Sequence, residues 1–153
     1  MTKIESDTPY YTYHNENPKN RKNGDCVLRA IATATCKTWD ETLDGLVTIA
    51  HIFKYAPATS ECYARYLESQ GFLKEKMPKK FDNTRYDGKE FCDYLNKKYE
   101  EKHPPVIAHI GSHHISCFMY DEFFGYRCYD TWDPTEYKVG IYYVHVSNIV
   151  HEK

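Results

Sequence analysis

The spacing of hydrophobic positions changes after about residue 100. Upstream of this point, apolar side chains recur three and four positions apart, which is the spacing of amphipathic helices. From Pro104 onward, β-branched and aromatic residues form short runs separated by turn residues, which is typical of β-strands. Helices followed by strands, without β–α–β alternation, predict an α+β fold and not a doubly wound parallel sheet.

Four helices are expected in the first part of the chain. The first begins at Gly24-Asp25, with Asp25 as its N-cap and Cys26 in its first turn. The second begins with a capping box at Thr38, and the third ends at Gly71, a residue suited to a left-handed C-terminus. The second, third and fourth helices are predicted over about 38–54, 59–71 and 87–99.

The second part of the chain predicts an antiparallel sheet of three to four strands. These strands are expected over 106–110, 115–120, 126–131 and 137–146. Residues 72–77 are expected to form a short strand or an extended link. We expect one domain over 1–153, made of an extended arm (1–24, with or without one short strand), a helical part (25–100) and a sheet part (104–147).

The composition argues against several classes of function. The 20 basic and 22 acidic residues nearly balance, so neither nucleic acid nor an anionic membrane is an expected partner. No run is apolar enough to cross a membrane, and no signal peptide is recognisable. The cysteines lack CxxC spacing, which predicts free thiols and a cytoplasmic location. All except Cys26 are interpreted as small buried hydrophobes: Cys36, Cys62, Cys92, Cys117 and Cys128.

Cys26 is the first candidate for chemistry. A thiol is a useful nucleophile only as the thiolate, and the dipole at a helix N-terminus favours that anion. The alternative interpretation is a small apolar residue in a helix that needs a slim side chain. Structural cysteines occur equally often in helix interiors, so the position directly after Gly24-Asp25 favours the nucleophile.

His114 and Asp130 are candidates for a base and the group that orients it. His114 opens one predicted strand, and Asp130 lies near the end of the next, so the turn at 122–125 brings them together. His113 points to the opposite face and is the weaker candidate. By the alternative interpretation, the His-His pair is surface polarity and Asp130 only starts a turn, a role that Asp133 before proline fits better.

A metal centre is a less favoured interpretation. His109, His113, His114 and Cys117 could form a cluster, but residues 113 and 114 face opposite ways on a strand. No second pair of Cys or His residues has the spacing of a zinc site, and no phosphate-binding or dinucleotide motif is present. We therefore expect neither a metal nor a cofactor.

The order Cys26, His114 and Asp130, with helices before the sheet, resembles the papain-like peptidases. In that family the orienting Asn is followed by Ser-Trp, and Asp130-Thr131-Trp132 is similar, which implies that Trp132 covers the His–Asp contact. An oxyanion-hole amide lies six residues before the nucleophile in the family, which by resemblance falls on Asn20.

The chain resembles still more closely small papain-like proteins from phages and prophages of Firmicutes. They carry motifs similar to those at 24–30, 37–41 and 129–133, and the likeness covers about residues 14–145. Three positions depart from the wider family. Asn20 is one methylene shorter than the usual Gln, Val27 replaces an aromatic residue, and Asp130 stands where many relatives carry Asn.

The resemblance implies a papain-like cysteine hydrolase, or thiol protease, acting on an amide, peptide or isopeptide bond of a protein or peptide substrate. The sequence leaves open whether the acyl group passes to water or to an amine, and also the oligomeric state. The alternative is a phage-encoded binding or inhibitor protein in the host cytoplasm, with a vestigial site on the same scaffold. A thiol-based crosslinking or redox role is disfavoured by the irregular cysteine spacing.

Overall fold

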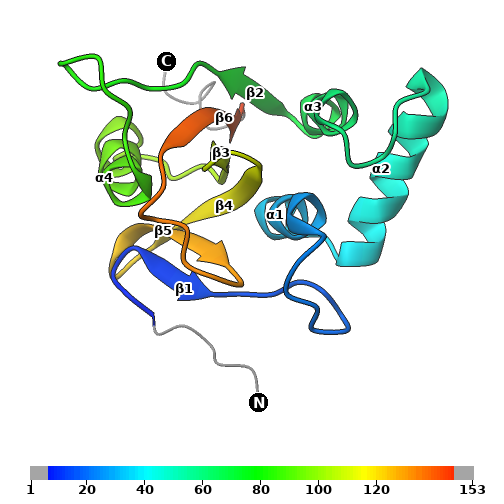
Figure 1. Ribbon diagram of the computed structural model, residues 1–153, viewed down its shortest axis with the longest axis horizontal. Helices are drawn as coiled ribbons and strands as arrows, with labels where there is room; N and C mark the ends of the chain where they lie inside the picture. Colours follow the sequence, from blue (N-terminus) through cyan, green and yellow to red (C-terminus); the bar gives the residue numbers. More distant parts are fainter. Residues whose placement is uncertain (1–6, 147–153) are drawn as a thin grey trace.

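The computed structural model describes residues 7–146, which form four helices and a mixed sheet of six strands (Figure 1). The elements are β1 (Tyr11–Tyr13), α1 (Cys26–Thr35), α2 (Trp39–Phe53), α3 (Ser60–Ser69), β2 (Phe72–Glu75), α4 (Gly88–Lys98), β3 (Val106–Ile110), β4 (His114–Asp121), β5 (Gly125–Asp130) and β6 (Val139–His145). The expected α+β class is confirmed.

The sheet is larger than the three to four strands expected. Its order is β1-β5-β4-β3-β6-β2, and its pairs are antiparallel except for β1, which runs parallel to β5. The two added strands are short and lie at the two edges. Each pairs with a strand that is distant in the chain, and such pairing leaves no turn signal between partners for a local pattern to reveal.

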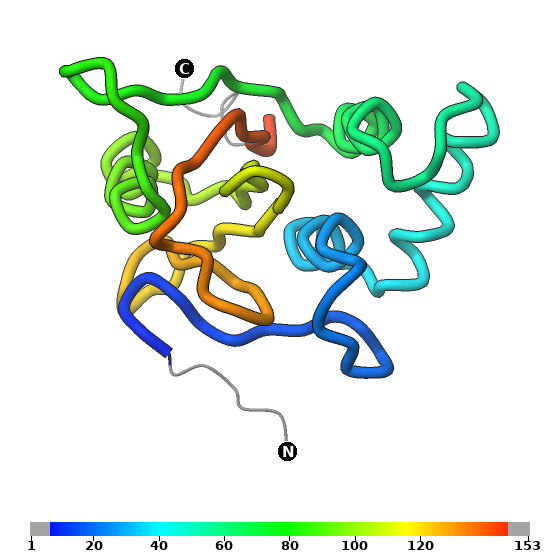
Figure 2. The backbone as a smooth tube through the Cα atoms, viewed as in Figure 1, coloured from blue at the N-terminus to red at the C-terminus, as the bar shows by residue number. Residues whose placement is uncertain are grey.

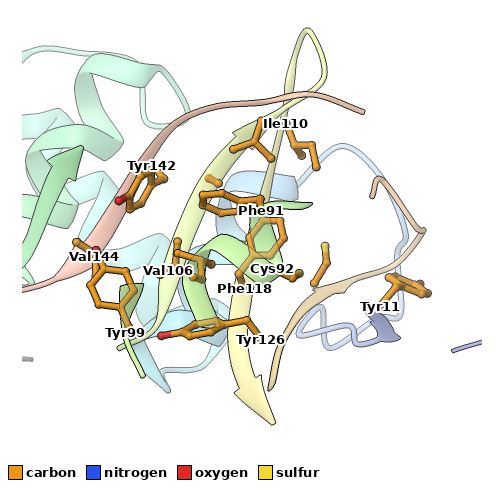
Figure 3. Close-up of a cluster of buried hydrophobic side chains, with 14 residues drawn as sticks. Tyr11, Phe91, Cys92, Tyr99, Val106, Ile110, Phe118, Tyr126, Tyr142 and Val144 are labelled. Carbon is orange, nitrogen blue, oxygen red and sulfur yellow. The ribbon is translucent and has the colours of Figure 1, made fainter. Parts of the chain in front are cut away.

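Two apolar clusters sandwich the sheet between α4 on one face and α1, α2 and α3 on the other (Figure 1). Strand alternation explains the division, because Val106 and Ala108 of β3 pack on the α4 side while Ile107 packs on the α1 side. Figure 3 shows the α4-side cluster, where the Phe91 ring lies 5.1 Å from that of Phe118. Burying each such ring stabilises the fold by roughly 1.5–3 kcal/mol.

The helix boundaries follow local signals that the sequence carries. The capping box at Thr38 is present, because the Thr38 side chain accepts from the Glu41 N–H and the Glu41 carboxylate accepts from the Thr38 N–H. Asp87 starts α4 in the same way. Thr59 caps α3, and Gly71 follows that helix at φ +88, a left-handed conformation that favours glycine.

The N-terminal arm is an integral part of the sheet, because its strand β1 pairs with the end of β5 that carries Asp130. The fully buried Tyr11 donates its hydroxyl to the Asp130 carbonyl at 3.1 Å, and the His14 N–H donates to the same oxygen at 2.9 Å. Beyond His14 the chain leaves the sheet and forms a loop before it reaches the start of α1 (Figure 2). The arm therefore joins the Asp130 strand to the helix that carries Cys26.

All six cysteines lie in the described residues and are unpaired. Four are buried as expected, but the interpretation of Cys36 as a buried hydrophobe is wrong. Cys36 is exposed because it follows the last turn of α1 at φ 56, where the chain turns away from the core. No helix within residues 7–146 has the length and apolar character needed to cross a membrane.

Candidate active site

Cys26 is the first residue of α1, and its thiol is half-buried against the start of β4. Burial by itself raises the pKa of the Cys26 thiol. The His114 imidazole outweighs that effect through a hydrogen bond and its charge, assisted by the Ile115 N–H and the Arg29 guanidinium, so that the pKa is lowered. The thiol therefore lies where the anion is favoured.

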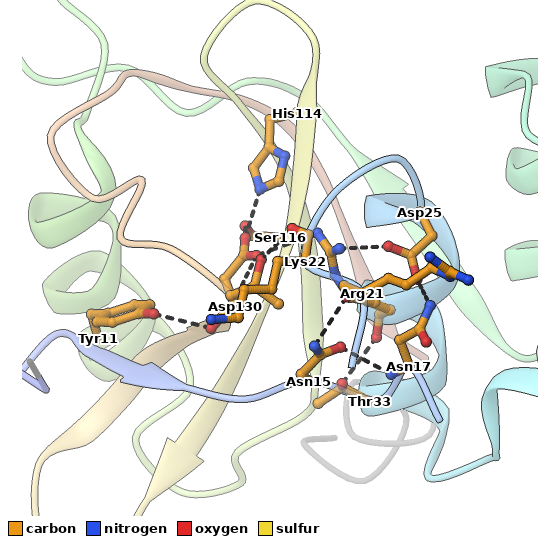
Figure 4. A network of polar contacts seen from close by, with 12 residues as sticks. Tyr11, Asn15, Asn17, Arg21, Lys22, Asp25, Thr33, His114, Ser116 and Asp130 are labelled. Atoms are coloured by element: carbon orange, nitrogen blue, oxygen red, sulfur yellow. Dashed lines mark hydrogen bonds and ion pairs between the residues drawn. The ribbon is translucent and has the colours of Figure 1, made fainter. Parts of the chain in front are cut away.

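His114 is the first residue of β4 and bridges the thiol and Asp130. Its Nε2 lies 2.6 Å from Asp130 Oδ2, which leaves Nδ1 for Cys26 (Figure 4). Burial lowers the pKa of His114, but the hydrogen bonds and charges of Asp130 and Cys26 raise it to about 9. A thiol with a lowered pKa beside an imidazole with a raised one is the signature of a thiolate–imidazolium pair.

The carboxylate of Asp130 is buried and held by several donors (Figure 4). Ser116, two positions along β4 from His114, donates its hydroxyl to the same Oδ2. The Thr131 N–H donates to Oδ1 at 2.7 Å, and the Arg29 guanidinium lies 3.7 Å from Oδ1. These contacts fix the direction of the carboxylate toward His114.

Asp25 precedes α1 as expected, but its side chain does not cap the helix. The carboxylate instead pairs with buried Arg29 at 2.5 Å and accepts from Asn17 Nδ2 and Trp39 Nε1, both at 2.8 Å. The backbone N–H groups of the first turn are thus left without a carboxylate. These N–H groups form the positive end of the helix dipole, which then acts on the neighbouring Cys26.

Trp132 covers the His114 ring. The two ring centroids are 4.8 Å apart, and Trp132 also packs edge-on against Tyr137 at 5.9 Å. An aromatic cover restricts water from the His114–Asp130 hydrogen bond, which strengthens the bond electrostatically. Trp132 therefore lies where the resemblance implied it would.

Cys26 and His114 lie between two cavities and line both. The larger, of about 570 Å³, is called the Lys22 cavity here and is also lined by Asn23, Gly24, Arg29, His113, Thr131 and Trp132. The smaller, of about 260 Å³, is called the Tyr63 cavity and is also lined by Val27, Ala58, Ser60, His109, Ser112, His113 and Ile115. A substrate chain that crossed the Cys26 sulfur would occupy both cavities.

The structure puts Asn20 outside this arrangement. Asn20 is exposed, adopts a left-handed φ of 57, and closes a turn by donating its N–H to the Asn17 carbonyl at 3.0 Å. It is not among the residues that line either cavity. Residues 17–20 form this turn, and it is Asn23, further along the chain, whose side-chain amide lines the Lys22 cavity.

His109, His113, His114 and Cys117 are the residues that a metal cluster in this part of the chain would use. Within residues 7–146, no group of three or more His, Cys, Asp or Glu side chains could hold a metal ion. His109 instead lies 2.9 Å from the Tyr63 hydroxyl through its Nε2. Burial lowers the pKa of His109, and the charge of Lys74 adds to the effect.

Sequence reasoning did not identify the contacts that Arg29 and Ser116 make with Asp130. It also did not identify the contacts of the Asp25 carboxylate with Arg29, Asn17 and Trp39. Two signals could have found them. Asp25 and Arg29 have the i, i+4 spacing of a helical ion pair, and Ser116 has the i, i+2 spacing that puts it on the His114 face of the strand.

Comparisons with protein-family models, with curated proteins and with solved structures find no match to this chain.

Proposed function

We propose that this chain is a cysteine-dependent hydrolase that cleaves an amide, peptide or isopeptide bond through Cys26, His114 and Asp130. The observation that carries the proposal is the continuous contact from the thiol through the His114 ring to a buried carboxylate, with the pKa of the thiol lowered and that of the imidazole raised. Such opposed shifts in one contact pair are how proteins ionise a thiol near neutral pH.

In the first step, the Cys26 thiolate attacks the carbonyl carbon of the scissile amide. The new C–S bond pushes the carbonyl π electrons onto oxygen, which becomes an oxyanion. The Cys26 backbone N–H lies at the uncapped start of α1 and Asn23 lines the adjoining cavity, so these two groups are proposed to stabilise that charge.

In the second step, the His114 imidazolium donates its Nδ1 proton to the leaving nitrogen. The C–N bond breaks, an amine departs, and a Cys26 thioester remains. Neutral His114 then removes a proton from water, whose oxygen attacks the thioester. The C–S bond breaks, the acid is released, and the thiolate–imidazolium pair is restored.

Three features of this chain support a papain-like scaffold for the chemistry. The nucleophile begins the first helix, the base begins a strand of the following sheet, and the orienting acid ends the neighbouring strand. The Asp130-Thr131-Trp132 segment covers the His114 ring with Trp132, which agrees with the proposed relationship. Asp130 instead of Asn gives this site a full negative charge beside the imidazolium.

The proposal is tested with wild type, Cys26→Ala and Cys26→Ser on a peptide library. Products are sequenced by mass spectrometry, and a parallel reaction with an added primary amine separates hydrolysis from acyl transfer. We expect cleavage by wild type, none by the Ala variant and almost none by the Ser variant, because a neutral hydroxyl is a far poorer nucleophile than a thiolate. Equal products from wild type and Cys26→Ala would refute the mechanism.

A binding protein on the same scaffold is the second candidate, favoured by exposed aromatic side chains away from the cleft. Phe81 is fully exposed and Phe123, at the turn between β4 and β5, is 90% exposed. Such residues are suited to contacts with another protein. If folded Cys26→Ala retains the whole effect of wild type in a host cell, the binding function is supported and hydrolysis is not required for it.

A further inference from the structure

The two cavities beside Cys26 differ in charge. The Lys22 cavity is lined by Lys22 and Arg29, and none of the described residues that line it carries a carboxylate. The Tyr63 cavity is lined by hydroxyl, histidine and apolar side chains, with no Lys, Arg, Asp or Glu among those described. Apart from Cys26 and His114, which line both cavities, the described lining of the cleft therefore carries cationic side chains on one side of the sulfur and no Lys, Arg, Asp or Glu on the other.

The two cations of the Lys22 cavity are not equivalent. Arg29 is buried, and its charge is balanced by Asp25 at 2.5 Å and Asp130 at 3.7 Å. Lys22 is half-buried, and within residues 7–146 it makes no ion pair. Its ammonium lies 5.7 Å from the ring centroid of Tyr13, a contact that leaves the charge uncompensated. Lys22 thus supplies the net positive charge of this cavity.

The backbone around Lys22 is anchored beside the site. The Lys22 carbonyl accepts from the Thr131 hydroxyl at 2.8 Å, directly after Asp130, and the Asn15 side-chain amide donates to the Arg21 carbonyl at 3.0 Å. Gly24 follows at φ +86, and a Cβ added there would meet no atom within 4 Å. The segment is held in place while leaving open space at Gly24.

We propose that the Lys22 cavity binds a carboxylate of the substrate, with Lys22 as the specificity-determining residue, while the Tyr63 cavity takes an uncharged part of the substrate. This inference rests on the proposed hydrolase function, whose substrate class it narrows to acidic peptides. A carboxylate beside Lys22 would gain Coulomb energy in a partly enclosed site, where attraction exceeds that in bulk water.

Lys22 can be changed without removing the ionised thiol. The groups that favour the Cys26 thiolate are His114, Ile115 and Arg29, and those that favour the His114 cation are Asp130 and Cys26. Lys22 belongs to neither set. Its substitution should therefore alter which reagent reaches the sulfur and leave the reactivity of the sulfur itself in place.

The test compares the alkylation of Cys26 by iodoacetate and iodoacetamide, which differ in one negative charge. In both reactions the thiolate sulfur displaces iodide from the CH₂ group. Wild type, Lys22→Met and Lys19→Met are compared at low ionic strength by mass spectrometry of the Cys26 peptide. Lys19→Met is the matched control, because it removes the same charge from an exposed position outside the cavity.

We expect Lys22→Met to lower the iodoacetate rate by about fivefold with little change in the iodoacetamide rate, and added salt to reduce the difference. Lys19→Met should retain the wild-type ratio of the two rates. An unchanged ratio in Lys22→Met would overturn the carboxylate inference even if Cys26 reacts rapidly with iodoacetamide. Slow reaction of wild-type Cys26 with both reagents would instead contradict the proposed thiolate.

A second set of probes identifies the kind of carboxylate. Chloroacetyl-glycine carries a terminal carboxylate, chloroacetyl-glutamate α-amide carries a side-chain carboxylate, and chloroacetyl-glycine amide is the neutral reference. We expect at least one acidic probe to alkylate Cys26 faster than the neutral one, and Lys22→Met to abolish that preference. Faster alkylation by the neutral probe in wild type would refute the inference.

Discussion

The two ends of helix α1 each carry a cysteine that is not fully buried, in opposite surroundings. Cys26 begins the helix, half-buried between two cavities and in contact with His114. Cys36 follows the last turn, exposed to solvent in a left-handed conformation. The helix dipole favours an anion at the first position and disfavours one at the second.

The comparison teaches that the less exposed of the two thiols is the one arranged to react. Exposure gives a reagent access to Cys36. At Cys26, burial raises the pKa and works against the thiolate, and the His114 ring reverses the outcome. We therefore expect reactivity at this helix to follow charged neighbours and not accessibility.

Among the substitutions that test the contrast between Cys26 and Cys36, Asp130→Ala should have the largest effect. It removes the acceptor of the Ser116 hydroxyl and of the Thr131 N–H and leaves buried Arg29 with Asp25 as its remaining ion-pair partner, so we expect the free energy of unfolding to fall by about 3 kcal/mol. Urea unfolding measures the loss. Asp130→Asn is the control, because it keeps an amide oxygen as acceptor and removes the charge, so a stability equal to that of wild type would contradict a role for the charge.

His114→Ala should remove the advantage of Cys26 over Cys36 near pH 6. An ordinary thiol is about 0.3% ionised there, but a thiolate of lowered pKa is also less nucleophilic, so we expect iodoacetamide labelling of Cys26 to slow by roughly tenfold to a hundredfold. His113→Ala should leave the labelling rate nearly unchanged, because the hydrogen bond to Asp130 comes from His114. The reverse result would assign the base to His113.

Cys26→Ser should change how stability depends on pH. The raised pKa of His114 contributes stability that is complete below its ordinary 6.5 and is lost as pH rises through about 9. The lowered pKa of Cys26 contributes stability that is complete above its ordinary 9.0 and is lost as pH falls. Between these limits the two slopes oppose each other in wild type.

In the Ser variant, of these two groups only His114 contributes to the slope of unfolding free energy against pH. The variant's free energy of unfolding, relative to wild type, should therefore fall as pH rises from about 6.5 to 8.5, by less than about 1.4 kcal/mol per pH unit. Urea unfolding of both proteins across this interval provides the measurement. Parallel profiles for the two proteins would mean that Cys26 is not ionised by its surroundings.

Cys36→Ser should have the smallest effect. The side chain is exposed and outside the cavities, so we expect the unfolding free energy to change by less than about 0.5 kcal/mol. The labelling rate of Cys26 should stay at the wild-type value. A lower rate at Cys26 would show that the two ends of the helix are coupled.

The sequence was most informative where structure depends on neighbouring residues. Short stretches of sequence encode three features: the Thr38 capping box, the left-handed Gly71, and the pairing of the strand that begins at His114 with the strand that ends at Asp130. Strands β1 and β2 were uncertain because their partners are distant, and that distance accounts for the underestimated sheet.

Errors at the site have a related origin. Asp25 has the residue type of an N-cap, but Arg29 four residues later and the more distant Asn17 and Trp39 take its carboxylate. Asn20 was expected from an offset found in the family that the sequence resembles, and the turn at Asn17–Asn20 holds it outside the residues that line the two cavities. The contacts of Asp25 with distant residues and the path of this loop depend on tertiary structure, which no local pattern reveals.

The central claim, that Cys26 and His114 form an ion pair, is tested most directly by the ultraviolet absorbance of the thiolate. The spectrum of Cys26→Ser is subtracted from that of wild type during a titration between about pH 4 and pH 10. We expect the thiolate signal to persist well below the ordinary thiol pKa of 9.0 and to shift back toward it in His114→Ala. A signal that develops only near pH 9 in wild type would contradict the ion pair and the hydrolase built on it.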